Sequence, residues 1–187
     1  FKLASYLTFA SISFIFLGNV DTILLGILLP DASAVGIYRS AFVLVSSLAG
    51  LLSFNKVLLP IFVSVKKSHL ENAFNRTFRY SMMIIIPSAA GLIALGNYFI
   101  LLIYGQEYIS ATVPLHFLAL FMIVAVQSDL FTNLFLIKEK TRDYLFLMLA
   151  VLVINIILNF VLIKYLLTFS TSAAIAGAAI ATLLSWL

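Results

Sequence analysis

Six long apolar stretches, separated by short polar breaks, restrict the folds available to this chain. Each of the first five contains at least the ~20 residues that cross a bilayer as an α-helix. A transmembrane β-barrel would need strictly alternating strands of about 10 residues, and the run Met82–Ile86 does not alternate. The sequence therefore predicts an all-α polytopic transmembrane bundle of about six spans, forming a single domain over residues 1–187. The predicted helices lie near residues 4–29, 35–65, 77–104, 109–137, 144–168 and 172–187.

The composition agrees with this fold class. Hydrophobic residues make up 64% of the chain and charged residues only 10%, far from the balance of a soluble domain. A soluble enzyme, a disordered segment and a nucleic-acid-binding module are thereby excluded. The chain contains no cysteine, so disulfides and thiolate chemistry are absent. It begins at Phe1 rather than at Met and stops inside an apolar run, so we expect it to be part of a longer protein.

The basic residues between the apolar stretches predict an orientation. If each stretch crosses the membrane once, one side carries a single basic residue, Lys164, and the other carries eight. Basic residues are enriched in cytoplasmic loops, so the side with eight is predicted to be cytoplasmic, and so is the start of the chain. The protein is then expected in the inner, cytoplasmic membrane. The eight residues are Lys2, Lys66, Lys67, Arg76, Arg79, Lys138, Lys140 and Arg142.

Polar residues inside the predicted spans are the candidate functional residues. A charge near the bilayer centre costs at least ~2.5–3.5 kcal/mol, so such a residue usually faces a bundle interior or a hydrated cavity. In the second span, a spacing of seven, four, three and seven residues places five positions on one stripe: Arg39, Ser46, Gly50, Ser53 and Pro60. We expect a hydrated cavity that binds a polar, anionic group. The candidates for its lining are Asp21, Arg39, Ser53, Lys56, Asp129 and Asn133.

Structural roles compete with this functional interpretation. The charged residues can pair with one another, Lys56 with Asp129 and Asp21 with Arg39, and Arg39 can also extend to the outer interface. We expect Asp21 and Arg39 to approach each other across the first hairpin. Asparagines spaced four apart, at Asn155 and Asn159, are predicted to bond a neighbouring helix rather than a ligand.

Other features of the spans are structural. Small residues four apart predict close helix packing, and prolines inside a span can bend it. The small residues are Gly18, Thr22 and Gly26, and then Ala173, Gly177, Ala181 and Ser185, and the prolines are Pro60 and Pro87.

Catalytic constellations are not found in the sequence. His69 and His116 are isolated, which argues against a metal site or a catalytic triad, and no glycine-rich phosphate loop occurs. We therefore expect no enzyme activity, no cofactor and no metal. An enzyme acting on lipid substrates would have to use Asp129, Glu107 or His116, and their spacing does not support it.

Several short motifs follow one another along the chain: Asn19–Gly26, Val35–Ala41, Leu59–Pro60, Ile103–Tyr108, Pro114–Leu115, Asn155–Asn159 and Gly177–Thr182. In this order they resemble the lipid-linked oligosaccharide (O-antigen) flippases, a family of polysaccharide transporters. These belong to the multidrug/oligosaccharidyl-lipid/polysaccharide exporter superfamily. The resemblance covers nearly the whole chain and implies the second of two lobes of about six helices each. The sequence departs from the family at Thr168–Ser172, where relatives often have a Pro-Gly turn.

The resemblance implies a flippase that works by alternating access. Its substrate would be an undecaprenyl-diphosphate-linked oligosaccharide, moved to the outer leaflet during polysaccharide or lipopolysaccharide synthesis. The expected partners are this lipid-linked oligosaccharide, membrane lipids and an N-terminal lobe of the same chain, with no nucleic acid. A multidrug antiporter of the same superfamily is an alternative, but it would favour an acidic cavity. A membrane-embedded glycan ligase or polymerase is a further alternative, which would need a larger external loop than this chain has.

Overall fold

The structure is a computed structural model that describes residues 2–53, 67–138 and 140–187, and within these ranges it is helical without strands. The predicted all-α class is therefore confirmed. The helices are α1 (Lys2–Leu17), α2 (Val20–Leu28), α3 (Ser33–Leu52), α5 (Lys67–Tyr104), α6 (Thr112–Ile137), α7 (Thr141–Leu167) and α8 (Thr171–Ser185), with a 3-10 helix η1 (Gln106–Ala111) before α6.

The number of helices able to span a membrane is slightly below the prediction. In the described parts of the chain, four helical segments are long and apolar enough: α3, most of α5, η1 with α6, and α7. The α1–α2 pair makes a fifth if it counts as one bent span. Helix α8 is apolar but has only 15 residues, about 22 Å at 1.5 Å per residue, shorter than a ~30 Å hydrocarbon core.

The first predicted helix is divided into α1 and α2, which meet at an angle of 43°. The division falls at Gly18 and Asn19, two residues that favour helix ends over helix interiors. The Asn19 side chain donates a hydrogen bond to the carbonyl of Ile15 at 2.8 Å, and the Asn19 backbone N–H bonds Phe16 in a tighter turn. The side-chain amide thus offers the backbone an alternative to the regular helix.

The predicted start of the third span near residue 77 is wrong, because the helix α5 already begins at Lys67. This helix has 38 residues and is about 57 Å long, so its polar first turns extend past a ~30 Å core. Those turns stay helical because Phe74 and Phe78 pack on Phe131 of α6, with ring centroids 5.3 and 6.3 Å apart. Helix α5 continues through Pro87, whereas Pro60 lies outside the described residues.

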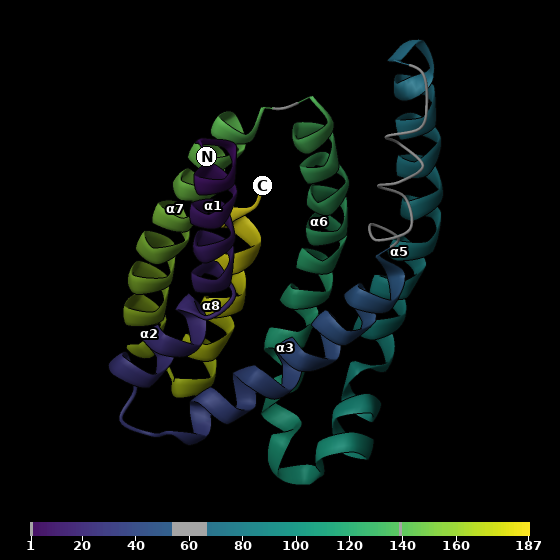
Figure 1. Cartoon of the computed structure of the whole chain (residues 1–187). Coiled ribbons are helices and arrows are strands. Elements are labelled where there is room, and N and C mark those ends of the chain that lie inside the picture. The colour runs from purple at the N-terminus through teal and green to yellow at the C-terminus, as the bar shows by residue number, and fades with distance from the viewer. Residues whose placement is uncertain (1, 54–66, 139) are drawn as a thin grey trace.

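The polar connections gather at two ends of the bundle. The start of α1, the start of α5 and the α6–α7 connection lie at one end, and the α2–α3, α5–α6 and α7–α8 connections lie at the other (Figure 1). At the α7–α8 turn, Ser170 caps α8 by accepting a hydrogen bond from the Ala173 N–H at 3.0 Å. A serine is among the residues that favour this capping position.

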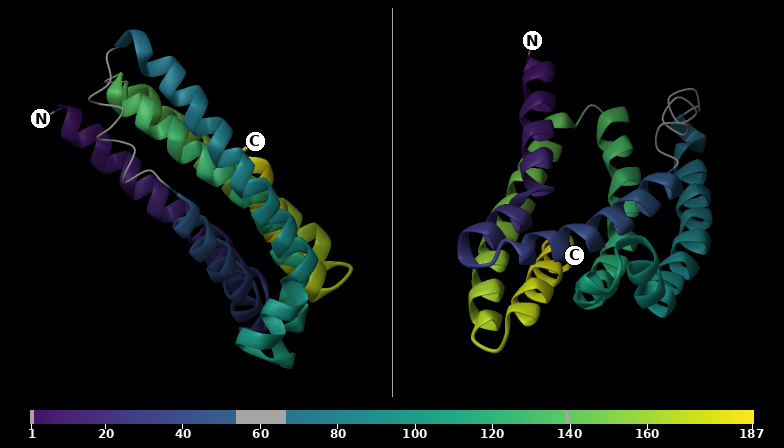
Figure 2. Two further views of the ribbon diagram at one scale, coloured as in Figure 1. Left: turned by 90° about the vertical axis from the view of Figure 1, so that its right-hand side faces the viewer. Right: turned by 90° about the horizontal axis from the view of Figure 1, so that it is seen from below.

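Helix α8 is central and packs against both α6 and α7. Its buried face is made of small residues, and an added Cβ at Gly177 would lie 3.2 Å from the Leu162 carbonyl oxygen of α7. The predicted small-residue packing is therefore confirmed for this helix. Figure 2 shows α1 and α3 along one side of the molecule, with α5, α6 and α8 along the other.

Candidate functional site

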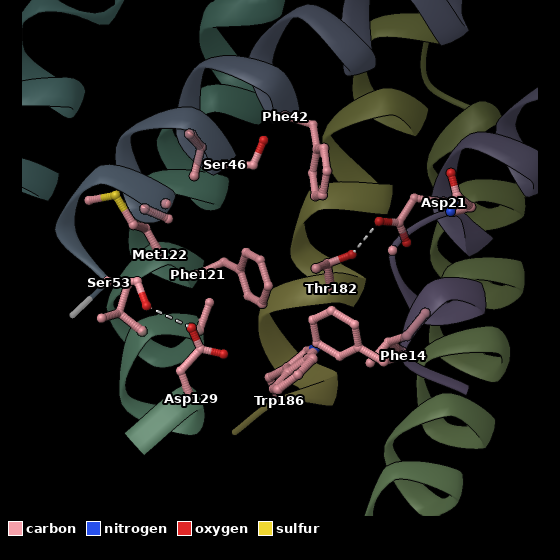
Figure 3. Close-up of a pocket in the computed structure, with 18 of the residues that line it drawn as sticks. Phe14, Asp21, Phe42, Ser46, Ser53, Phe121, Met122, Asp129, Thr182 and Trp186 are labelled. Carbon is pink, nitrogen blue, oxygen red and sulfur yellow. Dashed lines mark hydrogen bonds between the residues drawn. The ribbon is translucent and has the colours of Figure 1, made fainter. Parts of the chain in front are cut away.

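A cavity of about 480 Å³ lies between α1, α2 and α3 on one side and α6 and α8 on the other (Figure 3). Four of the six predicted site residues line it: Asp21, Arg39, Ser53 and Asp129. The rest of its wall is mostly apolar, as is usual for ligand pockets with a few placed polar groups. Among the other lining residues are Phe14, Phe42, Val45, Ser46, Ala49, Gly50, Phe121, Met122, Thr182 and Trp186.

Asp21 is held by hydrogen bonds from three other helices. Tyr38 of α3 and Thr182 of α8 donate to its Oδ2 at 2.5 and 2.7 Å, and Asn159 of α7 donates to its Oδ1 at 2.6 Å. Asp21 is 2% exposed, and its neighbours Tyr38, Asn159 and Thr182 are also buried. The hydrogen bonds from these three side chains compensate the carboxyl group for its burial.

The predicted pairing of Asp21 with Arg39 is wrong. The partner that Asp21 takes from α3 is Tyr38, the residue immediately before Arg39. Successive residues on a helix point about 100° apart, so the rotation of α3 that points Tyr38 at Asp21 directs Arg39 elsewhere. The Arg39 guanidinium instead lies over the ring of Phe42, with its central carbon 5.6 Å from the ring centroid.

Helix α3 carries two parallel stripes that explain this arrangement. Tyr38, Ala41 and Val45 form a buried stripe. Arg39 belongs to the neighbouring stripe, which continues through Ser46, Gly50 and Ser53 and lines the cavity, as the residue spacing predicted. The predicted stripe is thus confirmed from Arg39 to Ser53, and its last member, Pro60, lies outside the described residues.

The far end of the cavity holds a second carboxylate. Ser53, at the C-terminal cap of α3, donates a hydrogen bond to Oδ2 of Asp129 in α6 at 3.0 Å. Lys56, the predicted partner of Asp129, lies outside the described residues. Asn133 lies one turn beyond Asp129 and is buried, but it is not among the residues that line this cavity.

The two asparagines of α7 tie helices together, as predicted. Asn155 donates to the Ser185 hydroxyl of α8 at 3.0 Å, and Asn159 bonds both Asp21 and the Asn155 side chain. Both side chains are fully buried. Their role in this structure is therefore interhelical bonding.

Aromatic side chains form part of the cavity wall that the sequence analysis did not identify. Trp186 meets Phe121 of α6 edge-on, with centroids 5.9 Å apart, and meets Phe14 of α1 at 6.5 Å. No sequence signal separates these rings from the many other aromatic residues of the spans. Within the described ranges, no three His, Asp or Glu side chains gather as metal ligands.

Comparison with known families agrees with the resemblance found in the sequence. A family model for polysaccharide biosynthesis proteins matches residues 1–113, more than half of the chain. The chain belongs to this family. No curated protein and no solved structure shows significant similarity to it.

Membership of the polysaccharide biosynthesis family assigns the chain a role in that process, and its apolar helices make it a multi-pass membrane protein. The family match includes Asp21, Arg39 and Ser53, which form one side of the cavity. Asp129 and Thr182, from the other side, lie beyond the matched residues.

Proposed function

We propose that this chain is one lobe of a transporter that flips a lipid-linked oligosaccharide across the cytoplasmic membrane. The observation that carries the proposal is the mixed character of the cavity, which combines a cationic side chain, hydrogen-bonding groups and aromatic rings inside an apolar bundle. A polyprenyl-diphosphate sugar requires each of these features, because its phosphates are anionic, its sugars carry hydroxyl groups and its tail is apolar.

Arg39 is the proposed contact for the diphosphate. Its side chain is exposed on the cavity wall, where the guanidinium lies over the Phe42 ring. A guanidinium is always charged and binds phosphate through two parallel hydrogen bonds. An aromatic ring holds the cation without neutralising it, so the charge remains available to an anionic ligand.

The sugar part is proposed to occupy the end of the cavity near Asp129. The Ser53 hydroxyl and the Asp129 carboxylate can exchange hydrogen bonds with sugar hydroxyl groups. Phe121 and Trp186 line the same end and offer apolar ring surfaces against which a pyranose ring can pack.

The proposed orientation sets the direction of transport, from the cytoplasmic leaflet to the outer leaflet. The end of the bundle that carries the start of α5 and the α6–α7 connection is assigned to the cytoplasm, because its basic residues follow the positive-inside rule. Single cysteines at Asn72 and Lys140 should then react with a thiol reagent only after the membrane is permeabilised. A cysteine at Ala32 should react in intact cells, and the opposite labelling pattern would reverse the orientation.

Transport is proposed to occur by alternating access, with a second, N-terminal lobe of the same chain as the opposing wall of the cavity. Rocking of two lobes about a central site is the common mechanism of transporters built from repeated halves. We propose that the chain acts as a transporter rather than as an enzyme.

Flipping by the full-length protein in lipid vesicles tests the proposal. Radiolabelled undecaprenyl-diphosphate oligosaccharide is incorporated, and its outward movement is measured by access to an external glycosidase. Arg39→Gln should slow flipping about tenfold or more, in line with the loss of a buried charge-assisted contact. Arg142→Gln is the matched control, because Arg142 is exposed at the start of α7 and does not line the cavity. Equal rates for wild type and Arg39→Gln would overturn the proposal.

An organic-cation antiporter is the second candidate, because two carboxylates line the cavity. Three donors already satisfy Asp21, which leaves Asp129 as the more accessible acidic group. Ethidium efflux from the same vesicles distinguishes the two candidates. Efflux that depends on Asp129, without movement of the lipid-linked sugar, would favour the antiporter.

A further inference from the structure

Asp21 and Arg39 line one cavity but do not form an ion pair. The Arg39 side chain is long and flexible, so the absence of this pair needs an explanation. Two features of the structure explain it together. The rotation of α3 points Tyr38 toward Asp21, and the Asp21 oxygens already accept hydrogen bonds from Tyr38, Thr182 and Asn159.

We propose that Tyr38 is a positioning residue whose hydroxyl, together with those other donors, satisfies Asp21 and so keeps Arg39 available for an anionic ligand. This inference rests on the proposed function, in which Arg39 binds the diphosphate. Tyr38 does not touch the ligand. It acts by occupying Asp21, the carboxyl group that would otherwise compete with the ligand for the Arg39 guanidinium.

Tyr38 also reaches Arg39 through Phe42. The Tyr38 and Phe42 rings stack, with centroids 6.1 Å apart and planes inclined by 20°, and Phe42 carries the guanidinium. Tyr38 is 1% exposed, so its ring is held by the surrounding buried side chains. The same tyrosine thus binds Asp21 with its hydroxyl and supports the ring beneath Arg39.

The two functions of Tyr38 can be separated, because Tyr38→Phe keeps the ring stack and removes only the hydroxyl. Asp21 then lacks one of its two donors at Oδ2, and an incoming guanidinium can replace it. Arg39 would be drawn from the anion site to Asp21. The ligand must now compete with a carboxylate for the same cation, which lowers its apparent affinity.

The test measures binding of farnesyl diphosphate to the full-length protein in detergent, with farnesol as the uncharged probe. Tyr38→Phe should weaken binding of farnesyl diphosphate about tenfold or more, the effect of one hydrogen bond to a charged group. Farnesol binding should not change. The double variant Asp21→Asn, Tyr38→Phe should restore the affinity to within about twofold, because a neutral amide competes poorly for Arg39.

Arg39→Gln separates this inference from the proposed function. In that background Tyr38→Phe should have no further effect, since no guanidinium remains to be diverted. If Arg39→Gln itself binds farnesyl diphosphate like wild type, the proposed function fails. If Arg39→Gln binds weakly but Tyr38→Phe binds like wild type, only the role of Tyr38 is overturned.

Thr182→Val provides a second variant if Tyr38→Phe does not fold. It removes the other hydroxyl at Oδ2 from a different helix and leaves the ring stack untouched. It should weaken farnesyl diphosphate binding in the same direction and be rescued by Asp21→Asn. A loss of affinity that Asp21→Asn does not rescue would show that the donors act only through helix packing.

Discussion

Replacement of Asp21 by alanine should destabilise the lobe, and the structure allows the size of the effect to be worked out. The variant leaves the Tyr38 and Thr182 hydroxyls without their acceptor, whereas the Asn159 amide still donates to Asn155. Each orphaned buried donor costs about 1–3 kcal/mol, and removal of a buried charge recovers part of this sum. We expect Asp21→Ala to lower the free energy of unfolding by about 2–4 kcal/mol.

The assay is unfolding of the purified full-length protein in mixed micelles of increasing sodium dodecyl sulfate, followed by circular dichroism. Asp31→Ala is the matched control, because Asp31 is exposed in the α2–α3 turn and its side chain accepts hydrogen bonds from Ser33 next to it in the turn. That variant should lose about 1 kcal/mol or less, because hydrogen bonds at an exposed turn contribute little. If Asp21→Ala were as stable as Asp31→Ala, Asp21 would not be the tie between helices that we describe.

Two further predictions concern local packing and charge. Gly177→Ala should destabilise the protein by about 1 kcal/mol, although alanine has the better helix propensity, because the added Cβ would press on the α7 backbone. Gly91→Ala is its control, since a Cβ at Gly91 meets nothing within 4 Å. It should be neutral or stabilising in the same unfolding assay. Hydrogen bonds from Ser33 hold the pKa of Asp31 below its ordinary value, so their stabilisation is present at neutral pH and is lost as pH falls through that lowered pKa. Ser33→Ala should raise the Asp31 pKa, which a carboxyl ¹³C NMR titration measures; an unchanged titration would contradict the assignment.

The helices were predictable because length and apolarity are sufficient evidence for membrane-spanning segments. The ends of the helices were less predictable. The polar residues that begin α5 resemble a loop in composition, but Phe74 and Phe78 among them pack on Phe131 of α6 within a continuous helix. The division between α1 and α2 depends on the side chain of Asn19, whose choice between backbone partners is decided by local geometry.

The site was predictable in its residues but not in their pairing. A polar side chain inside the bilayer is costly in free energy when it faces lipid, so such side chains gather inside the bundle. Asp21, Arg39, Ser53 and Asp129 accordingly line one cavity. Pairing depends on the rotation of each helix, and one residue changes the direction by about 100°. Arg39 was expected at a level in the membrane from which it could reach Asp21, but the rotation of α3 points Tyr38 toward Asp21 instead.

The two carboxylates of the cavity have a common structural consequence. Asp21 connects α2 to α3, α7 and α8, and Asp129 connects α6 to the end of α3, so both join helices that are distant in sequence. In the proposed rocking mechanism a lobe must move as one body, which requires polar ties that survive while the contacts to the opposing lobe change. Apolar packing alone is a weak tie in a membrane, because lipid tails solvate the same surfaces. The acidic residues would then hold the lobe together, and Arg39, with an aromatic ring for a neighbour, would be the charge left to meet the substrate.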